Sequence, residues 1–268
     1  MKKLLFIGNS HLATMKESEH IANYKVDYIG FSFQSNFNID FFENTRTGDG
    51  IQIPDNSPSA QKKLWKITTG SPSSLALEGY DAYFIVGIIT PPNPWRGFSH
   101  FDGLLNNTNI PPISFDCYIE IIRSLQAEEI RLANYIQAVI RKNSRGRLIF
   151  FIPLPYVRDD AELFNRGLTP PTFWTALPEE DKAILISCEA SNYKKALARF
   201  GIELLIPPAS LVINGNRCPA VFSKGALGSP NFAGSLNPAW GDDDLSHKNI
   251  EYGKEWWEYI NKLTHKIF

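Results

Sequence analysis

An α/β fold built around a parallel sheet is predicted from three features of the sequence. Five short apolar runs recur along the chain, helical patterns lie between several of them, and turn-forming or polar residues close each run. Short apolar runs of this kind are typical of strands that are covered on both faces. Strands that alternate with helices favour right-handed crossovers and a sheet that carries helices on both sides.

The composition supports one sizeable hydrophobic core and argues against binding to nucleic acid. The chain has 268 residues, of which 43% are hydrophobic and 21% are charged. This is enough apolar material for a single domain that spans residues 1–268. Lysine and arginine number 27 against 28 aspartate and glutamate residues, a net charge of −1. Nucleic acid is not expected as a partner, because the chain has no basic excess to neutralise phosphates.

A soluble protein in a reducing, cytoplasmic setting is expected. No apolar stretch approaches the roughly 18 residues of a membrane span. The apolar run at the start stops at Gly8, which is too short for a secretory signal, so we expect a buried strand there. The three cysteines form no even disulfide framework. Cys117 and Cys188 are expected to pack as small hydrophobes, whereas Cys218 lies in a long loop and could be exposed.

Five strands and four helices are predicted in order. The strands cover residues 4–7, 26–31, 82–89, 148–152 and 202–206, and the helices cover 12–23, about 116–143, 178–200 and about 249–263. In the longest helix, apolar residues return every three, four or seven positions and define one apolar face. Pro178 suits a first helical position, acidic residues follow it, and Gly201 closes that helix. Trp257 and Ile260 are expected to face inward from the last helix.

This alternation predicts a flavodoxin-like three-layer sandwich with a five-stranded, mostly parallel sheet. Three segments interrupt the pattern and are rich in glycine, proline, asparagine and serine: residues 32–79, 90–115 and 207–246. They are too long to be plain connectors. Loops of such length are usually functional, carry small elements of their own, or indicate a misassigned element.

A serine follows the first strand, where ligands bind in parallel α/β sheets. The block Gly8-Asn9-Ser10-His11 lies between that strand and the first helix. Ser10 there would place its hydroxyl in the crevice and its backbone N–H at the positive end of a helix, where it could receive an oxyanion. The alternative is that Ser10 is only the N-cap of the helix.

A second polar block precedes the last helix. Asp244 and His247 are three residues apart, so the carboxylate could orient the imidazole and leave its other nitrogen free as a base. A serine alcohol needs such a base, and the base needs an orienting acid. In two alternatives, residues 242–244 form a solvated acidic turn beside a surface histidine, or they hold a divalent cation with His247.

Together the two blocks resemble those of the SGNH hydrolases, the GDSL-like esterases and lipases. Members of that superfamily have a Gly-Asp-Ser or Gly-Asn-Ser block after the first strand and a late Asp-x-x-His block. The matching residues here are Gly8-Asn9-Ser10 and Asp244 with His247. The resemblance implies the SGNH fold and a triad in which Ser10 is the nucleophile, His247 the base and Asp244 the orienting acid. It implies no metal and no cofactor.

The chain departs from the family at the oxyanion hole. The family's Gly-x-Asn-Asp block would match residues 87–90, where Ile89 replaces the asparagine. The remaining oxyanion candidates are the N–H groups of Ser10 and Gly87, together with the side chain of Asn93. Loss of one such donor typically costs about two to three orders of magnitude in turnover.

Three further residues are candidates for substrate binding: His11, Trp95 and Trp240. The sequence therefore predicts a serine esterase that cleaves an ester or acetyl group from a small molecule or a glycan. Two alternatives remain open. The same triad could transfer an acyl group to a polysaccharide, or the chain could be a non-catalytic glycan- or partner-binding module on a degenerate hydrolase fold.

Overall fold

The computed structural model covers the chain, and the structure describes most of the predicted elements. The described residues are 2–9, 11–30, 46–47, 50–53, 55, 57, 59, 62, 65–66, 74–88, 114–143, 148–156, 159, 177–214, 217–223 and 248–268.

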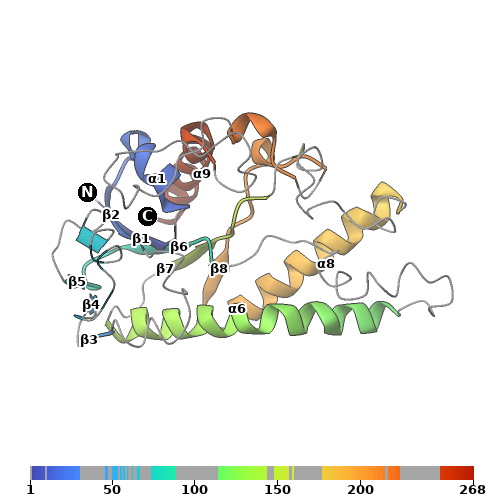
Figure 1. Cartoon of the computed structure of the whole chain (residues 1–268), viewed down its shortest axis with the longest axis horizontal. Helices are drawn as coiled ribbons and strands as arrows, with labels where there is room; N and C mark the ends of the chain where they lie inside the picture. Colours follow the sequence, from blue (N-terminus) through green and yellow to red (C-terminus); the bar gives the residue numbers. More distant parts are fainter. Residues whose placement is uncertain are drawn as a thin grey trace.

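A five-stranded, all-parallel sheet forms the centre of the molecule (Figure 1). Its strands are β1 (Lys3–Gly8), β2 (Lys25–Gly30), β6 (Ala82–Val86), β7 (Leu148–Ile152) and β8 (Ile202–Leu204). Their spatial order is β2-β1-β6-β7-β8, which is the order of flavodoxin-like doubly wound sheets. The predicted α/β class and parallel sheet are confirmed. The strand order changes direction between β1 and β6, and ligands bind at such switch points in open α/β sheets.

Helices cover both faces of this sheet, as in a three-layer α/β sandwich (Figure 1). Helices α1 (Leu12–Glu17) and α9 (Ile250–Ile267) lie on one face, and α6 (Phe115–Asn143) and α8 (Glu179–Ala198) lie on the other. Successive side chains of a strand point to opposite faces. Thus Phe6 packs with the α1 and α9 side chains, and its neighbours Leu5 and Ile7 pack with those of α6 and α8.

A second, small sheet lies within the segment 32–79, which the sequence presented as a long loop. Strands β3 (Arg46–Thr47), β4 (Gly50–Gln52) and β5 (Ser74–Ala76) pair antiparallel in that order. Ile51, Ile53 and Trp65 from the same segment join the core on the α6 and α8 side. The segment therefore contributes small elements and core side chains. Short 3₁₀ turns η4 (Ala209–Leu211) and η5 (Ala220–Phe222) occur within the segment 207–246.

The observed boundaries differ from the predicted ones for local reasons. The first helix ends at Glu17, because Ser18 turns its hydroxyl back to the Thr14 carbonyl and a 3₁₀ turn, η1 (Glu19–Ile21), follows. Strand β6 ends at Val86, three residues earlier than predicted. Pro178 is the N-cap of α8 and not its first helical residue. Helix α9 continues to Ile267, and its Trp257 and Ile260 are fully buried as expected.

The cysteines partly reverse the expectation from the sequence. Cys117 is exposed on α6, so it does not pack as a small hydrophobe, while Cys218 is buried. The Cys188 side chain is partly exposed to solvent. Cys117 precedes the point at which α6 meets the core, whereas Cys218 packs beneath α9 with Tyr252. None of the helices in the described ranges combines the length and apolar character that crossing a bilayer requires.

Candidate functional site

The structure describes the residues that flank the candidate site rather than the proposed triad. Ser10, Asn93, Trp95, Trp240, Asp244 and His247 lie outside the described residues. His11 and Gly87 are described, and so are Asn9 before Ser10 and Lys248 after His247. The geometry of both flanking segments can therefore be followed.

The first flanking segment is the end of β1, where Gly8 allows a close approach of three elements. A Cβ atom on Gly8 would overlap the carbonyl oxygen of Val86 at the end of β6 and lie 3.2 Å from the Leu12 side chain in α1. A carbonyl oxygen of a strand cannot move away as a flexible side chain could. Glycine at this position therefore permits β1, β6 and α1 to meet at the switch point of the sheet.

Asn9 ties the end of β1 to the end of β6. Its side-chain Nδ2 donates a hydrogen bond to the Gly87 carbonyl at 2.8 Å, and its Oδ1 accepts one from the His11 backbone N–H at 3.1 Å. The residue is only 8% exposed. The bond to residue i+2 is an Asx turn, a common use of asparagine where a chain reverses. Asn9 thus fixes the peptide that enters α1 relative to the neighbouring strand.

The contact with Asn9 requires glycine at position 87. Its φ of +76° lies in the left-handed region that favours glycine, and an added Cβ would lie 2.5 Å from the Asn9 Oδ1. The Gly87 N–H donates to the Ile152 carbonyl at 3.0 Å. That N–H is therefore hydrogen-bonded to the neighbouring strand β7 in this structure.

His11 stands at the entrance of α1. It is the N-cap residue, its side chain makes no capping bond, and its carbonyl accepts a hydrogen bond from the Thr14 hydroxyl at 2.9 Å. The His11 backbone already has helical dihedral angles, with φ of −69° and ψ of −11°. The His11 side chain is half-buried, which is compatible with contact to a ligand.

The second flanking segment is anchored by Lys248 and Asn249. The Lys248 Nζ donates to the Ser223 hydroxyl at 2.8 Å, and both side chains are buried. The Asn249 backbone N–H donates to the Phe222 carbonyl at 2.8 Å, and its side-chain Nδ2 donates to the Val221 carbonyl, also at 2.8 Å. Residues 221–223 and 248–249 are therefore joined, and this junction closes the base of the segment 224–247 that carries the Asp244 and His247 candidates.

Asn249 also begins helix α9. Its Oδ1 accepts a hydrogen bond from the Tyr252 backbone N–H at 3.3 Å, which is the usual bond of an N-cap asparagine. The same residue therefore holds the loop base and sets the first turn of the helix.

The first turns of α1 and α9 lie against each other (Figure 1). A Cβ on Gly253 would overlap the Thr14 carbonyl oxygen and the Ser18 hydroxyl, so the two backbones are in close contact. One turn further along α9, the Trp257 indole N–H donates to the Met15 carbonyl at 2.8 Å. Helix α1 begins just after the carboxyl end of β1. The last turn of α9 lies at the opposite edge, because the Thr264 hydroxyl is hydrogen-bonded to that of Tyr24, just before β2, and the Phe268 ring contacts the Lys2 ammonium group, just before β1. Both helices therefore begin at the carboxyl edge of the sheet.

Three weakly acidic groups lie in the core beside this edge. Burial raises the pKa of the Cys218 thiol to about 11, with a smaller increase from Asp159, although the nearby Lys248 cation opposes the rise. Burial likewise raises the pKa of the Tyr252 and Tyr156 phenols far above their ordinary value. These groups keep their protons near pH 7.

Within the described ranges, no group of three or more His, Cys, Asp and Glu side chains could hold a metal ion. The sequence matches no known family model and no curated protein. The function must therefore be inferred from the fold and from the two anchored segments.

Sequence reasoning missed the anchoring roles of Asn9 and Lys248. An asparagine after glycine at a strand end is a signal for an Asx turn, so half of the Asn9 role was readable. The bond from Asn9 to Gly87 could not be predicted from the sequence, because the two residues are 78 positions apart. Lys248 follows an acidic run and looks like a solvated residue, since lysine is rarely buried.

Proposed function

We propose that the chain is a serine esterase of the SGNH type that cleaves an ester or acetyl group from a small molecule or a glycan. Ser10 is the nucleophile, His247 the general base and Asp244 the residue that orients the imidazole. The proposal depends on the order of the two sequence blocks and on the anchored segments that flank them.

The observation that carries the proposal is the contact between the first turns of α1 and α9. Ser10 lies two residues before α1, and His247 lies three residues before α9. Gly253 and Thr14 bring these two helices together at the edge of the sheet where ligands bind in such folds. A Ser–His pair that depends on both ends of the chain requires this arrangement of the flanking helices.

The reaction proceeds in two steps. The Ser10 oxygen attacks the ester carbonyl carbon while His247 takes its proton, and the same proton passes to the leaving alcohol. A water molecule then attacks the acyl-Ser10 ester, with His247 again as base, and releases the acid and the free serine. Asp244 remains ionised and stabilises the imidazolium that forms in each step.

The oxyanion assignment follows from the bonding of the neighbouring groups. The N–H of Gly87 is already bonded to Ile152, and that of His11 to Asn9. The proposal therefore assigns the oxyanion to the N–H of Ser10, with Asn93 as the second donor. A weaker oxyanion hole than that of the family implies slow turnover.

Hydrolysis of p-nitrophenyl acetate and of acetylated sugars tests the proposal. Ser10→Ala should abolish activity, and Ser210→Ala, an exposed serine in η4, should leave it unchanged. Asp244→Asn should lower kcat strongly, whereas Asp242→Asn in the same acidic run should not. In the wild type, kcat/KM should rise with pH near the ordinary histidine pKa of about 6.5. Equal activity of Ser10→Ala and the wild type would contradict the proposal.

Two measurements separate the alternatives. A fluorophosphonate probe should label Ser10 stoichiometrically, and absence of labelling would favour a non-catalytic binding module. Product analysis with an acyl donor and a glycan acceptor should give free acid. Acylated glycan as the main product would instead assign the same triad to acyl transfer.

A further inference from the structure

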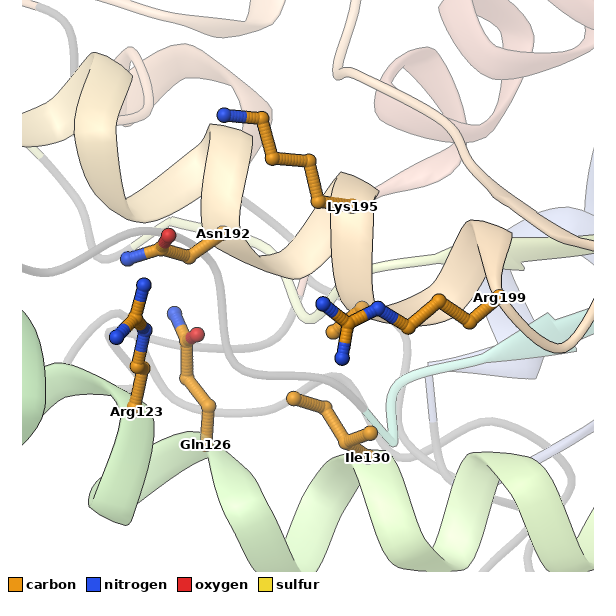
Figure 2. Close-up of a pocket in the computed structure, with 7 residues that line it drawn as sticks. Arg123, Gln126, Ile130, Asn192, Lys195 and Arg199 are labelled. Atoms are coloured by element: carbon orange, nitrogen blue, oxygen red, sulfur yellow. The ribbon is translucent and has the colours of Figure 1, made fainter.

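A pocket with basic walls lies between α6 and α8, on the sheet face opposite to α1 and α9. It has a volume of about 170 Å³. Helix α6 contributes one wall and helix α8 the other (Figure 2). The lining residues are Arg123, Gln126, Ile130, Asn192, Lys195, Ala196 and Arg199. Three of them are cationic and none is acidic, although the whole chain carries a net charge of −1.

Both helices contribute polar groups to this pocket. Figure 2 shows Arg123 and Gln126 on α6 with their polar ends turned toward Asn192 on α8, and Arg199 reaching back over Ile130. The Lys195 amine is turned away from these groups in the same view. The pocket therefore presents two guanidinium groups and two amides, and a lysine lies at its rim.

One donor in this group lacks an acceptor. The Asn192 Nδ2 is buried from solvent and has no hydrogen-bond partner among the described residues. The amide of Gln126, which is only 2% exposed, is used differently, because its Nε2 donates to the Glu189 carbonyl at 3.4 Å. A buried amide donor without a partner carries the cost of its lost hydration, and an acceptor placed in the pocket would remove that cost.

The cations are only partly neutralised by the protein. Arg123 pairs with Glu120, three residues earlier on α6, and both side chains are more than half exposed. Such exposed pairs contribute little to stability. No ion pair joins Lys195 or Arg199 to a described acidic residue. An anion that enters the pocket therefore meets cationic side chains that no described acidic residue neutralises.

We propose that this pocket binds the phosphoryl group of a small molecule. Donors stand on two opposite walls, so the anion must offer acceptors in several directions. A tetrahedral phosphate does this, whereas a planar carboxylate does not. Arginine pairs with phosphate oxygens through its planar fork of donors. The free ion and a phosphate monoester share this chemistry, and the pocket lies apart from the proposed esterase site.

Isothermal titration calorimetry on the full chain, at constant ionic strength, tests the proposal. Inorganic phosphate and glycerol phosphate are titrated separately, with acetate as the comparison anion. We expect saturable binding of at least one phosphate compound and weaker binding of acetate. Tighter binding of glycerol phosphate would identify a monoester as the ligand, and equal or weaker binding would identify the free ion. Absence of saturable phosphate binding, or equal binding of acetate, overturns the proposal.

Matched variants locate the binding. The double variant Arg123→Gln/Arg199→Gln should weaken phosphate binding by at least about tenfold, since each charge-assisted bond contributes that much or more. Arg131→Gln/Lys194→Gln removes two exposed cations from the same helices outside the pocket, and it should change binding by no more than about twofold. Asn192→Leu should also weaken binding, without loss of thermal stability, because it removes a buried unpaired donor. Equal losses of phosphate affinity in the two double variants would contradict the assignment of binding to this pocket.

Discussion

At the residue scale, Asn9 is the side chain on which the entrance of α1 depends. It is nearly buried, and it is bonded to two backbone groups that belong to different elements, the Gly87 carbonyl after β6 and the His11 N–H before α1. A side chain that spans two chain segments can hold a turn more rigidly than a contact within one of them. The residue next in sequence is the proposed nucleophile, so the stability of this turn and the proposed chemistry are linked.

Replacement of Asn9 should destabilise the protein. Asn9→Ala removes both bonds and leaves the buried Gly87 carbonyl without its donor, which should lower the free energy of unfolding by about 1–3 kcal/mol. Urea denaturation at pH 7 measures this change. Asn23→Ala, at an exposed asparagine in a turn, should change stability by less than about 0.5 kcal/mol. Similar losses in both variants would contradict the role of Asn9.

Asn9→Asp separates the two bonds of the residue. Aspartate keeps the acceptor for His11, but the ionised form cannot donate to Gly87 and places a charge beside its carbonyl. The folded state should therefore raise the pKa of the introduced carboxyl, and the variant binds more protons when folded than when unfolded. Its stability relative to the wild type should be highest below about pH 4 and fall as the pH rises through the folded-state pKa.

At the scale of elements, the contact between α1 and α9 depends on one glycine. Gly253 has no room for a Cβ, because the Thr14 carbonyl and the Ser18 hydroxyl occupy that space. Trp257 then fixes the rotation of α9 through its bond to Met15. Together these contacts set how closely the two helices approach and where their first turns lie.

Gly253→Ala should destabilise the protein although alanine is the better helix former. In an open helical position this change would stabilise by roughly 0.5–1 kcal/mol. Here the overlap with a backbone oxygen forces α1 and α9 apart, and overpacking of this kind costs about 1–3 kcal/mol. Thermal unfolding measures the change, and Lys262→Ala, exposed on the same helix, should be nearly neutral. A stabilised Gly253→Ala would show that the helices are not in close contact.

The sequence predicted some elements closely and others poorly, for physical reasons. Helix α6 was placed to within one residue, because its apolar face repeats over 29 residues. Strands β3 to β5 were missed, since two or three residues are too few to display an alternating pattern. The carboxyl edge of the sheet was predicted as the candidate site from a general rule of α/β folds. The hydrogen bond from Lys248 to Ser223 at that edge could not be predicted, because it depends on tertiary burial of a charged residue.

At the scale of the whole molecule, the two faces of the sheet have different characters. One face packs aromatic rings from strands and α9, with Phe6 stacked on Phe84 and tilted against Trp257. The other face carries α6 and α8, which diverge from a shared core to leave the basic pocket between them. The proposed esterase site belongs to the edge beside the first face, and the proposed phosphoryl site belongs to the second. Ligands at the two sites are therefore expected to bind without competing.

Buried thiol and phenol groups should make the folded state less stable at alkaline pH. Burial raises the pKa of the Cys218 thiol from an ordinary value of 9.0 to about 11, and it raises the pKa of the Tyr252, Tyr118 and Tyr28 phenols further. Each group binds its proton more tightly in the folded state than in the unfolded state. Their stabilisation is complete below the unfolded-state pKa and is lost as the pH rises toward the folded-state pKa.

Cys218→Ala isolates one part of this effect. Between about pH 9 and 11 the unfolded thiol loses its proton while the folded thiol keeps it, so the wild type should lose roughly 1.4 kcal/mol of stability per pH unit through this group. The variant lacks that contribution, and the stability difference between the two proteins should shrink over this range. Urea denaturation at pH 8, 9, 10 and 11 measures it, with Cys117→Ala, at an exposed cysteine, as the control. A difference between wild type and Cys218→Ala that stays constant from pH 8 to 11 would mean that the thiol ionises equally easily in both states, and the packing of Cys218 beneath α9 would have to be revised.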